Sequence, residues 1–575
     1  MIVTDKKIKK PQRSYFSETL DISSWDEVKP LLEAMKEESL NSEKELLGFI
    51  EKYGELENIV HEEAARRYID MTRFADNEEK GKAFHTFYAS VVSQMKPYDF
   101  EFKKKIYDNK HFRSLPQEKF GHLQRIIAND MELYREENIP LQVKESGLST
   151  KYGAINSRLT ASFDGEEKTL SQLGVYLKDP DRKTREKAWR LRMETLGSAK
   201  EELDNLFDQL KEVRIRQAHN AGFENYRDYK HRELGRFSYT PEDIMAFHDA
   251  VEHEVIPFLR ELNQERREAL EVESVRPWDT AVDLDGKTLK PFGDSEELIN
   301  GAIRILKDVK EGYAAQLEMM KNSGLLDLEN RKGKAPGGYN YPLAETKAPF
   351  IFMNAVGLHR DVVTLLHESG HAMHTFATRD ITITPYLHTP SEVAELASMG
   401  MEFLTMDYWG HFYSDPSDLN KARRDQLEGA LKFLPWCMIV DAFQQWIYTH
   451  PGHTAEERDA YFAGLMERFN PGVDWSGLEK EKIVSWMYQL HIFEAPFYYI
   501  EYGMAQLGAL ALYRNYKTKG KEATLKEYDA FLALGYSCPV EKLYETAGLQ
   551  FHFNRDYVRE IVGFTRQALN ELQAY

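Results

Sequence analysis

The chain has 575 residues and a formal net charge of −19 at pH 7. A nucleic-acid-binding protein is expected to show a basic face, so this charge argues against such a function. Cys437 and Cys538 are the two cysteines, and no disulfide framework is expected from so few. At this length the chain can form two or more lobes around a deep cleft.

Helical patterns dominate the first half of the chain. Ser24-Trp25-Asp26-Glu27 predicts a capping box at a helix start, and Thr240-Pro241-Glu242-Asp243 predicts another. Apolar and charged residues recur at spacings of three and four through most of residues 24–270, which is typical of amphipathic helices. The first ten residues include five charged ones and no apolar segment follows them, so we expect no secretory signal. The sequence contains no run of about 18 apolar residues, so we expect no membrane span.

Turns and short strands interrupt this helical pattern. Residues 276–293 contain two prolines and two glycines, which favour turns. Residues 334–341 predict a turn that leads into a short strand, and residues 350–354 predict a second strand. We therefore expect a small sheet just before the next helix.

That next helix contains His367-Glu368-Ser369-Gly370-His371, an H-E-x-x-H pattern. On an α-helix, His367 and His371 lie one above the other, so both imidazoles can bind one metal ion. Glu368 points beside them, where a carboxylate can accept a proton from a metal-activated water. A pair of packed or solvated histidines is the alternative, but the Val- and Leu-rich residues 361–366 predict a buried helix. The pattern therefore predicts a zinc-binding helix.

A catalytic zinc ion usually has a third protein ligand and one open position. His374 lies about two turns from His367, too far along the helix to share a metal with both histidines. A structural histidine bonded to a neighbour is the better interpretation of His374. Further on, Thr389, Pro390 and Glu392 fit the N-cap, first and third positions of a second helix, a capping box that would engage Glu392.

Glu395 lies one turn inside this second helix, among small and apolar residues. A buried carboxylate needs a partner, and a metal ion is a suitable one. Glu402 lies two turns further on and fits better as a partner of a ligand or as an ion-pair member. The residues favour Glu395 as the third ligand but leave other candidates open. These candidates are His374, Asp380, His388, Glu392 and Glu402.

A histidine and several tyrosines lie close together near the C-terminus. Pro496 fits a helix start, after which Tyr498 and Tyr502 are four residues apart on one face, and Tyr499 and Tyr502 are three apart. A phenol is an uncharged donor at neutral pH and can stabilise a developing oxyanion. An aromatic stripe in the core would have the same spacing, so the residues alone leave both interpretations open.

Three blocks of this sequence together resemble the thimet-type oligopeptidases, a family of zinc metallopeptidases. The resemblance is closest to the branch of oligoendopeptidase F and Pz-peptidase. The matching blocks are residues 367–374, 391–399 and 491–502, in this order. The resemblance covers roughly residues 200–570, and the part before it matches less well and is helical.

The resemblance implies a mainly α, multi-helical, two-lobed fold of the zincin type. It implies a small β-sheet next to the H-E-x-x-H helix and a deep central cleft. The expected parts are an N-terminal helical lobe at residues 1–200 and a catalytic zinc metallopeptidase domain at residues 201–575.

The resemblance also assigns roles within the site. It implies one Zn²⁺ per chain, and the ligands would be His367, His371 and Glu395. It implies a general base, Glu368, and groups that bind substrate and the tetrahedral intermediate, which correspond to His491, Tyr498 and Tyr502. Which tyrosine meets the oxyanion is left open.

The activity that the resemblance implies is zinc-dependent hydrolysis of internal bonds in short, unstructured oligopeptides. The charge and the absence of an expected signal or membrane span make a cytoplasmic enzyme without nucleic acid or membrane partners the simplest interpretation. A dipeptidyl carboxypeptidase of similar fold is the nearer alternative, and it would need a pocket for the free substrate carboxylate. A non-catalytic peptide-binding protein with a vestigial site is the more distant one. Because zinc peptidases commonly pair the peptide backbone with a sheet edge, we expect residues 350–354 to lie along that edge. A small structural hairpin packed under the metal helix is an equally good interpretation.

Overall fold

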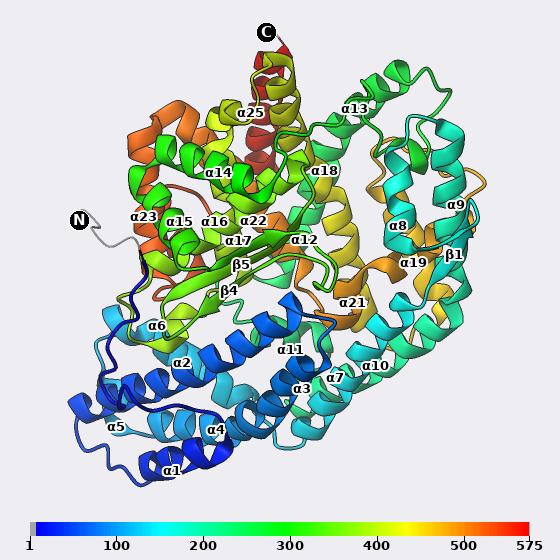
Figure 1. Cartoon of the computed structure of the whole chain (residues 1–575). Coiled ribbons are helices and arrows are strands. Elements are labelled where there is room, and N and C mark those ends of the chain that lie inside the picture. The colour runs from blue at the N-terminus through cyan, green and yellow to red at the C-terminus, as the bar shows by residue number, and fades with distance from the viewer. Residues whose placement is uncertain (1–6, 574–575) are drawn as a thin grey trace. The chain divides into compact units, whose positions relative to one another are not determined.

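The computed structural model describes residues 7–573 and is mainly helical (Figure 1). The first six residues of the charged N-terminal segment lie outside the described residues. The contacts divide the chain into two compact units, each made of several segments. Unit 1 contains the described parts of Met1–Met131, Leu289–Ala422 and Gly508–Phe551, and unit 2 contains those of Glu132–Thr288, Arg423–Leu507 and His552–Tyr575. A boundary between lobes at residue 200 stays a prediction.

Unit 1 contains the N-terminal helices, a small sheet and the H-E-x-x-H helix. Its helices are α1 (Trp25–Lys36), α2 (Glu43–Arg73), α3 (Glu78–Phe87), α4 (Ser93–Tyr107), α5 (Lys110–Ser114), α6 (Gln117–Leu133), α14 (Ser295–Val309), α15 (Glu311–Asn322), α16 (His359–Ala377), α17 (Ser391–Thr405), α23 (Lys521–Leu534) and α24 (Val540–Thr546). Its strands are β3 (Leu326–Glu329), β4 (Tyr339–Leu343) and β5 (Ala348–Ala355), and its short helical turns are η1 (Tyr88–Val92), η5 (Thr384–Leu387) and η6 (Met406–His411).

Unit 2 is also helical and contains a short hairpin of β1 (Thr160–Phe163) and β2 (Glu166–Thr169). Its helices are α7 (Asn138–Ser157), α8 (Leu170–Val175), α9 (Arg182–Ser198), α10 (Lys200–Asn220), α11 (Tyr226–Glu233), α12 (Pro241–Ala250), α13 (Ile256–Ala269), α19 (Ala455–Arg468), α20 (Glu479–Val484), α21 (Leu490–Glu494) and α25 (Arg555–Gln573), with the short turns η2 (Tyr176–Lys178), η3 (Val251–Val255), η4 (Pro277–Asp279) and η7 (Ser485–Tyr488). Most residues of α18 (Pro416–Thr449) belong to unit 2, and α22 (Tyr499–Lys519) has residues in both units.

Local sequence signals fix where several of these helices begin. Ser24 is the N-cap of α1, and the Glu27 carboxylate accepts a hydrogen bond from its backbone N–H at 2.7 Å. Thr240 caps α12, where Asp243 donates its N–H to the Thr240 hydroxyl at 3.2 Å and its carboxylate accepts from Thr240 N–H at 2.8 Å. Each box satisfies backbone donors that a helix start leaves unpaired. Both predicted capping boxes are confirmed.

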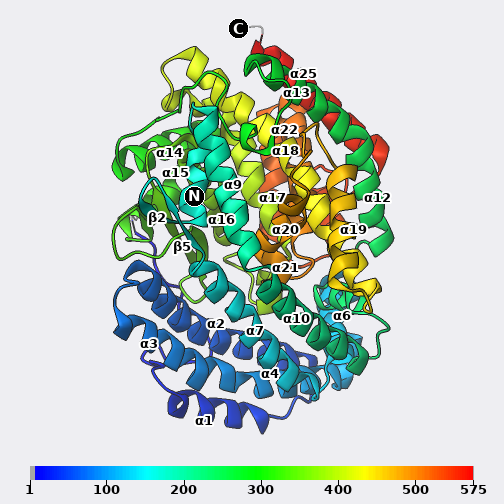
Figure 2. The same ribbon diagram turned by 90° about the vertical axis from the view of Figure 1, so that its right-hand side faces the viewer.

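The N-terminal helices of unit 1 enclose an aromatic core. Phe102 of α4 packs edge-on against Phe49 and Tyr53 of α2, with ring centroids 5.3 and 4.9 Å apart. These rings belong to a buried apolar cluster that continues into α1 and α6. Figures 1 and 2 both show α1 beside α4 in this layer.

The sheet of unit 1 has the strand order β3-β5-β4, with β5 parallel to β3 and antiparallel to β4. The expectation that residues 350–354 form the edge is therefore wrong, because they belong to the central strand. The physical reason is burial: Phe350, Ile351, Phe352 and Met353 are all buried, as is typical of a strand covered on both faces. Figure 1 shows α15 and α16 on one side of this sheet and α2 on the other.

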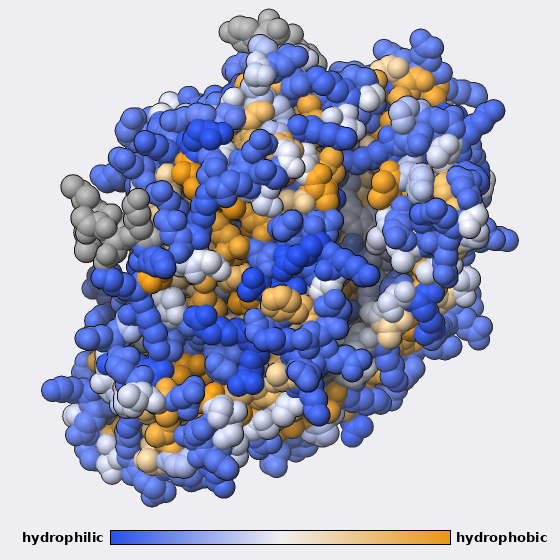
Figure 3. Space-filling view, viewed as in Figure 1, coloured by the Kyte–Doolittle hydropathy of each residue, from blue (hydrophilic) through white to orange (hydrophobic). Residues whose placement is uncertain are grey.

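The face of the molecule in Figure 3 is mostly hydrophilic, with scattered apolar patches. Such a surface fits the formal net charge of −19, which reflects 94 acidic and 75 basic side chains. Among the residues that the structure describes, no helix combines the length and the apolar character that crossing a membrane requires.

Candidate metal centre

Helix α16 contains the H-E-x-x-H residues, and α17 crosses it very closely. The crossing point is Gly370, where a Cβ atom would lie 2.5 Å from the Ala397 carbonyl oxygen and 2.6 Å from Ser398 Cα. Any larger side chain would collide with this backbone, so a glycine is required for the two helices to approach so closely. The crossing brings the first turns of α17 to the two histidines.

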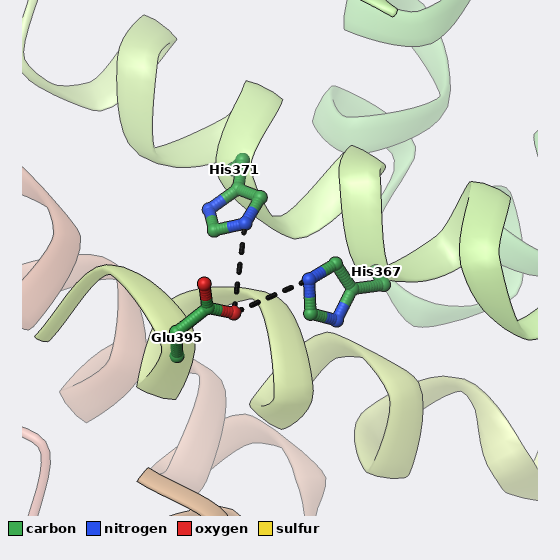
Figure 4. Close-up of side chains that lie close together, drawn as sticks. All are labelled: His367, His371 and Glu395. Atoms are coloured by element: carbon green, nitrogen blue, oxygen red, sulfur yellow. Dashed lines mark ion pairs between the residues drawn. The ribbon is translucent and has the colours of Figure 1, made fainter. Parts of the chain in front are cut away.

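The side chains of His367, His371 and Glu395 converge at this crossing (Figure 4). Glu395 Oε2 lies 3.3 Å from His367 Nε2 and 3.8 Å from His371 Nε2, and one ligand atom from each residue lies within 4.8 Å of the others. Two imidazole nitrogens and a carboxylate oxygen form the donor set of many catalytic zinc sites. These residues are the ones in residues 7–573 that form such a group. They fit a metal ion.

Partners on α17 orient two of these side chains. Glu402 Oε1 lies 2.7 Å from His367 Nδ1, so the ring donates its Nδ1–H to this carboxylate and turns Nε2 toward Glu395. A carboxylate in this position fixes the tautomer of a metal-binding histidine and makes it a better ligand. The Ser398 hydroxyl donates to Glu395 Oε2 at 3.0 Å.

The charges of the group depend on one another. Burial alone would raise the pKa of Glu395, but the hydrogen bond from His367 and the charge of the imidazoles lower it to about 2. Burial would lower the pKa of His367, but Glu395 and Glu402 raise it well above its ordinary value. Burial lowers the pKa of His371 to about 4. The Glu395 carboxylate therefore stays ionised and attracts a cation to the imidazoles.

Glu368 lies one step round α16 from His367. Its side chain is buried, and its Oε2 atom has no hydrogen-bond partner within residues 7–573. Burial raises the pKa of Glu368 to about 7. From strand β4, the Asn340 side-chain amide donates to the Glu368 backbone oxygen at 3.0 Å, which ties the sheet to the motif.

Apart from Glu402, the other candidates for the third ligand lie elsewhere. His374 is buried beside Phe531, with ring centroids 6.0 Å apart, and its Nε2 has no hydrogen-bond partner among the described residues. It is a core residue, although the predicted bond to a neighbour is not found. His388 lines a cavity of about 470 Å³ among α2, α4 and α6, and Asp380 contributes to the electrostatic field at Lys347.

The predicted capping box at the start of α17 is wrong. Pro390 is the N-cap and the helix begins at Ser391, so Thr389 stays outside it. Glu392 is buried in the first turn, where the Tyr544 hydroxyl donates to its backbone oxygen at 2.8 Å. Packing against α24 sets this helix start instead of a threonine cap.

The predicted C-terminal residues lie together in unit 2. His491 belongs to α21, and its ring centroid lies 6.0 Å from that of Tyr498 and 6.1 Å from that of Tyr502. The rings of Tyr498 and Tyr502 are 5.2 Å apart, as their spacing predicts. Pro496 does not start the helix, because α22 begins at Tyr499. The roles of His491 and the tyrosines stay a prediction.

A strained residue separates Pro496 from Tyr498. Phe497 has φ 66°, a left-handed conformation that is costly for a bulky side chain. Arg236 donates to the Phe497 carbonyl at 2.5 Å, and Gln444 Oε1 accepts from its N–H at 2.9 Å. Arg236 also forms a buried ion pair with Glu501 at 2.7 Å. This bracket of three side chains holds the chain in the conformation from which Tyr498 emerges.

Several site residues escape the sequence patterns. Gly370 and Ser398 are the points of helix crossing, Asn340 lies in a strand distant in sequence, and Arg236 lies more than two hundred residues before its partner Glu501. A glycine between the metal-binding histidines was the one available signal, because glycine is uncommon inside a helix without a packing reason. The other contacts depend on tertiary folding.

A mainly helical chain in which an H-E-x-x-H helix meets a glutamate of the following helix belongs to the class of H-E-x-x-H metallopeptidases. The family model described as "Peptidase family M3" matches residues 175–563, which is more than half of the chain. The chain therefore belongs to peptidase family M3. The predicted resemblance is confirmed.

Individual relatives agree with this assignment. Oligopeptidase PepF of Bacillus subtilis is 24% identical over 387 residues, which are 66% of this chain and 56% of PepF, so the match spans about half of that relative. A solved structure of Pz peptidase A with an inhibitor has a TM-score of 0.86 and 27% identity, covering 95% of this chain and 97% of that chain. A structure provisionally described as oligoendopeptidase F has a TM-score of 0.87 and 26% identity, covering 96% and 98%. These matches confirm the predicted fold class of helices with a small sheet.

The helix crossing can be tested by Gly370→Ala. The added Cβ meets backbone atoms of α17, so we expect the helices to separate, the metal content after dialysis to fall, and the protein to lose about 1–3 kcal/mol of stability. Metal analysis and urea unfolding measure both effects. The matched control is Gly464→Ala on α19, where no atom lies within 4 Å of the new Cβ; it should be neutral or slightly stabilising. Equal behaviour of the two variants would disprove the role of the crossing.

Proposed function

We propose that this chain is a zinc-dependent endopeptidase that hydrolyses internal bonds of short, unstructured oligopeptides. The observation that carries the proposal is the convergence of His367, His371 and Glu395 on one point at the crossing of α16 and α17. Membership of peptidase family M3 and the similarity to PepF and Pz peptidase A support the same activity.

We propose one Zn²⁺ per chain at this point. His367 Nε2, His371 Nε2 and Glu395 Oε2 would hold it, with Glu402 orienting His367. A bound zinc ion supplies a Lewis acid that lowers the pKa of water and polarises a carbonyl group.

Glu368 is the general base in this proposal. Its side chain is adjacent to His367 and buried, and its Oε2 atom is the unpartnered one, so it can accept a hydrogen bond from the attacking water. The Glu368 carboxylate takes a proton from this water while the water oxygen attacks the scissile carbonyl carbon. The same carboxyl group then gives the proton to the leaving amine, and the C–N bond breaks.

His491, Tyr498 and Tyr502 are the donors that we assign to the carbonyl oxygen as it gains negative charge. The phenol hydroxyls donate without carrying a charge themselves. Donors held in fixed positions stabilise such charge at no cost of reorganisation, and one of them is typically worth about 10²–10³-fold in kcat. Phe497 and its bracket support this role, because backbone strain tends to persist at functional sites.

We further propose that β4, which is the sheet edge beside α16, binds the peptide main chain. Pro342 pairs with Pro349, and neither has an N–H, so this pair is not hydrogen-bonded. Because pairs alternate along an antiparallel ladder, Asn340 and Ile351 are also a non-bonded pair. The N–H of Ile351 indeed donates to Leu325 on the far side of β5, at 2.9 Å. The backbone N–H and C=O of Asn340 therefore point away from β5, toward the outer edge.

The remaining expectations concern partners and location. The charge of −19 fits a protein without a nucleic-acid partner, and we propose a cytoplasmic location and peptide substrates.

Two substitutions separate the roles of base and ligand. Glu368→Gln keeps the shape of the side chain but cannot take a proton, so we expect full zinc content and a kcat about 10²–10⁴-fold lower. Glu395→Ala removes a ligand, so we expect zinc to be lost on dialysis. Metal analysis and peptide turnover measure both. Normal turnover by Glu368→Gln, or full zinc content in Glu395→Ala after chelator washing, would contradict these assignments.

The position of cleavage distinguishes the proposed endopeptidase from a dipeptidyl carboxypeptidase. We expect chelator-sensitive cleavage of internal bonds in peptides with an amidated C-terminus, since no free carboxylate is needed. Mass mapping of products from peptides of increasing length measures this. Failure on amidated peptides, with dipeptides released from the free acids, would establish the alternative. Absence of both zinc and chelator-sensitive cleavage would favour a non-catalytic peptide-binding protein.

The proposed edge pairing can be tested at Asn340. Asn340→Pro removes the outward N–H and the side chain, whereas Asn340→Ala removes the side chain alone. An edge strand tolerates proline where the N–H faces outward. A lost hydrogen bond of about 1 kcal/mol should raise KM about three- to tenfold in the proline variant compared with the alanine variant. Identical KM values for the two variants would exclude main-chain pairing at this residue.

A further inference from the structure

A chain of side-chain hydrogen bonds ends at His491. Trp436 of α18 directs its indole Nε1–H to Gln489 Oε1 at 2.8 Å. The other atom of the same amide, Gln489 Nε2, lies 2.7 Å from His491 Nδ1. All three residues belong to unit 2.

The chemistry of the three groups fixes the direction of every bond in this chain. An indole N–H can only donate, so the atom of Gln489 that faces it must be the oxygen. The amide nitrogen, which can also only donate, therefore faces His491. Its bond to Nδ1 requires that Nδ1 carries no proton, and a neutral imidazole then has its proton on Nε2.

We infer that Trp436 and Gln489 are positioning residues that hold His491 as a neutral imidazole with an Nε2–H donor. The inference rests on the proposed function, in which His491 donates to the carbonyl oxygen of the substrate. A neutral donor adds no positive charge to a centre that already attracts a metal cation. Protonation at Nδ1 would place two N–H groups against each other, so the chain of bonds also opposes the imidazolium form.

The backbone around Gln489 does not depend on its side chain. Its N–H donates to Trp486 O at 2.9 Å, and its carbonyl accepts from Ile492 N–H at 3.1 Å at the start of α21. These bonds alone would hold the turn before α21. The amide is therefore available for a role that local folding does not require.

The surroundings of the ring favour the same state. Burial lowers the pKa of His491, which favours the neutral form of the ring. The ring lies against aromatic side chains, and Tyr499 is nearest, with centroids 4.8 Å apart. Titratable groups with contacts to α21 include Tyr152 of α7, Arg214 of α10, and Tyr498, Tyr499 and Tyr502 at the start of α22.

The first test reads the proton directly. We would label the protein with ¹⁵N-histidine and identify the His491 signals as those lost in His491→Asn. At neutral pH we expect an unprotonated Nδ1 and a protonated Nε2. A protonated Nδ1 would overturn the inference. This readout does not depend on hydrolysis, so it stays valid if the proposed function fails.

The second test reverses the polarity of the chain by Gln489→Glu. A carboxylate beside Nδ1 stabilises the imidazolium and should raise the pKa of His491 by about one to three pH units. The matched control is Gln209→Glu, the same change on the exposed face of α10. An unmoved His491 titration in folded Gln489→Glu would overturn the inference. Should that variant not fold, Gln489→Met serves instead, because it removes the amide that donates to Nδ1. If His491 kept both the wild-type tautomer and the wild-type titration in Gln489→Met, the inference would equally be overturned.

The consequence for hydrolysis is a shifted pH profile. The acid limb of the kcat/KM profile should move to higher pH in Gln489→Glu. If the pKa of His491 rises to one pH unit above 7, about a tenth of the rings stay neutral at pH 7, so kcat/KM there should fall about tenfold. The Gln209→Glu control should keep the wild-type limb. If the pKa of His491 rises but the acid limb of kcat/KM stays in place, the catalytic role of His491 is rejected. If the acid limb shifts together with the pKa, both that role and the positioning role of Gln489 are supported.

Discussion

The close crossing of α16 and α17 is the constraint on which the site depends. Glu395 is supplied by a different helix from the two histidines, so the distance between helix axes decides whether three donors can share one ion. Gly370 allows a backbone contact at this point, and a single methyl group there would collide with α17. Packing on the far side of α17 holds it in place, where Gly400 leaves room for Leu512 and Tyr528. The metal centre is thus a product of helix packing before it is one of ligand chemistry.

Electrostatics then makes the crossing selective for a cation. Glu368, Glu395 and Glu402 are all buried close to the two imidazoles. Burying several carboxylates is unfavourable unless positive charge compensates them. Protonation of His367 offers part of that compensation, and a divalent metal offers more while leaving the imidazoles neutral. The group therefore gains most from a metal ion, and Glu402 keeps Nε2 of His367 directed toward it.

How far the sequence predicts this molecule depends on the range of each signal. The H-E-x-x-H spacing, the capping boxes at Ser24 and Thr240, and the preference for a buried Glu395 are local, and the structure agrees with them. The errors occur where tertiary packing overrides a local preference. Pro390 and Pro496 both suggested helix starts, but the helices begin at Ser391 and Tyr499, and the distant Tyr544 contacts the first turn of α17. A run of apolar residues signals a strand without telling whether it lies at the edge or in the centre of a sheet.

The surroundings of His491 differ from the metal centre in how polar groups are fixed there. At the metal centre, charge fixes the geometry, whereas around His491 uncharged groups do so through directional bonds from Trp436 and Gln489. The bracket on Phe497 adds a buried ion pair, but it acts on the backbone before Tyr498 rather than on a reacting group. Neutral donors suit an oxygen that becomes negative only during reaction, because a permanent positive charge would also bind carboxylate products tightly. In the proposed mechanism, a peptidase that releases two peptide products each turnover would therefore benefit from donors that stay neutral.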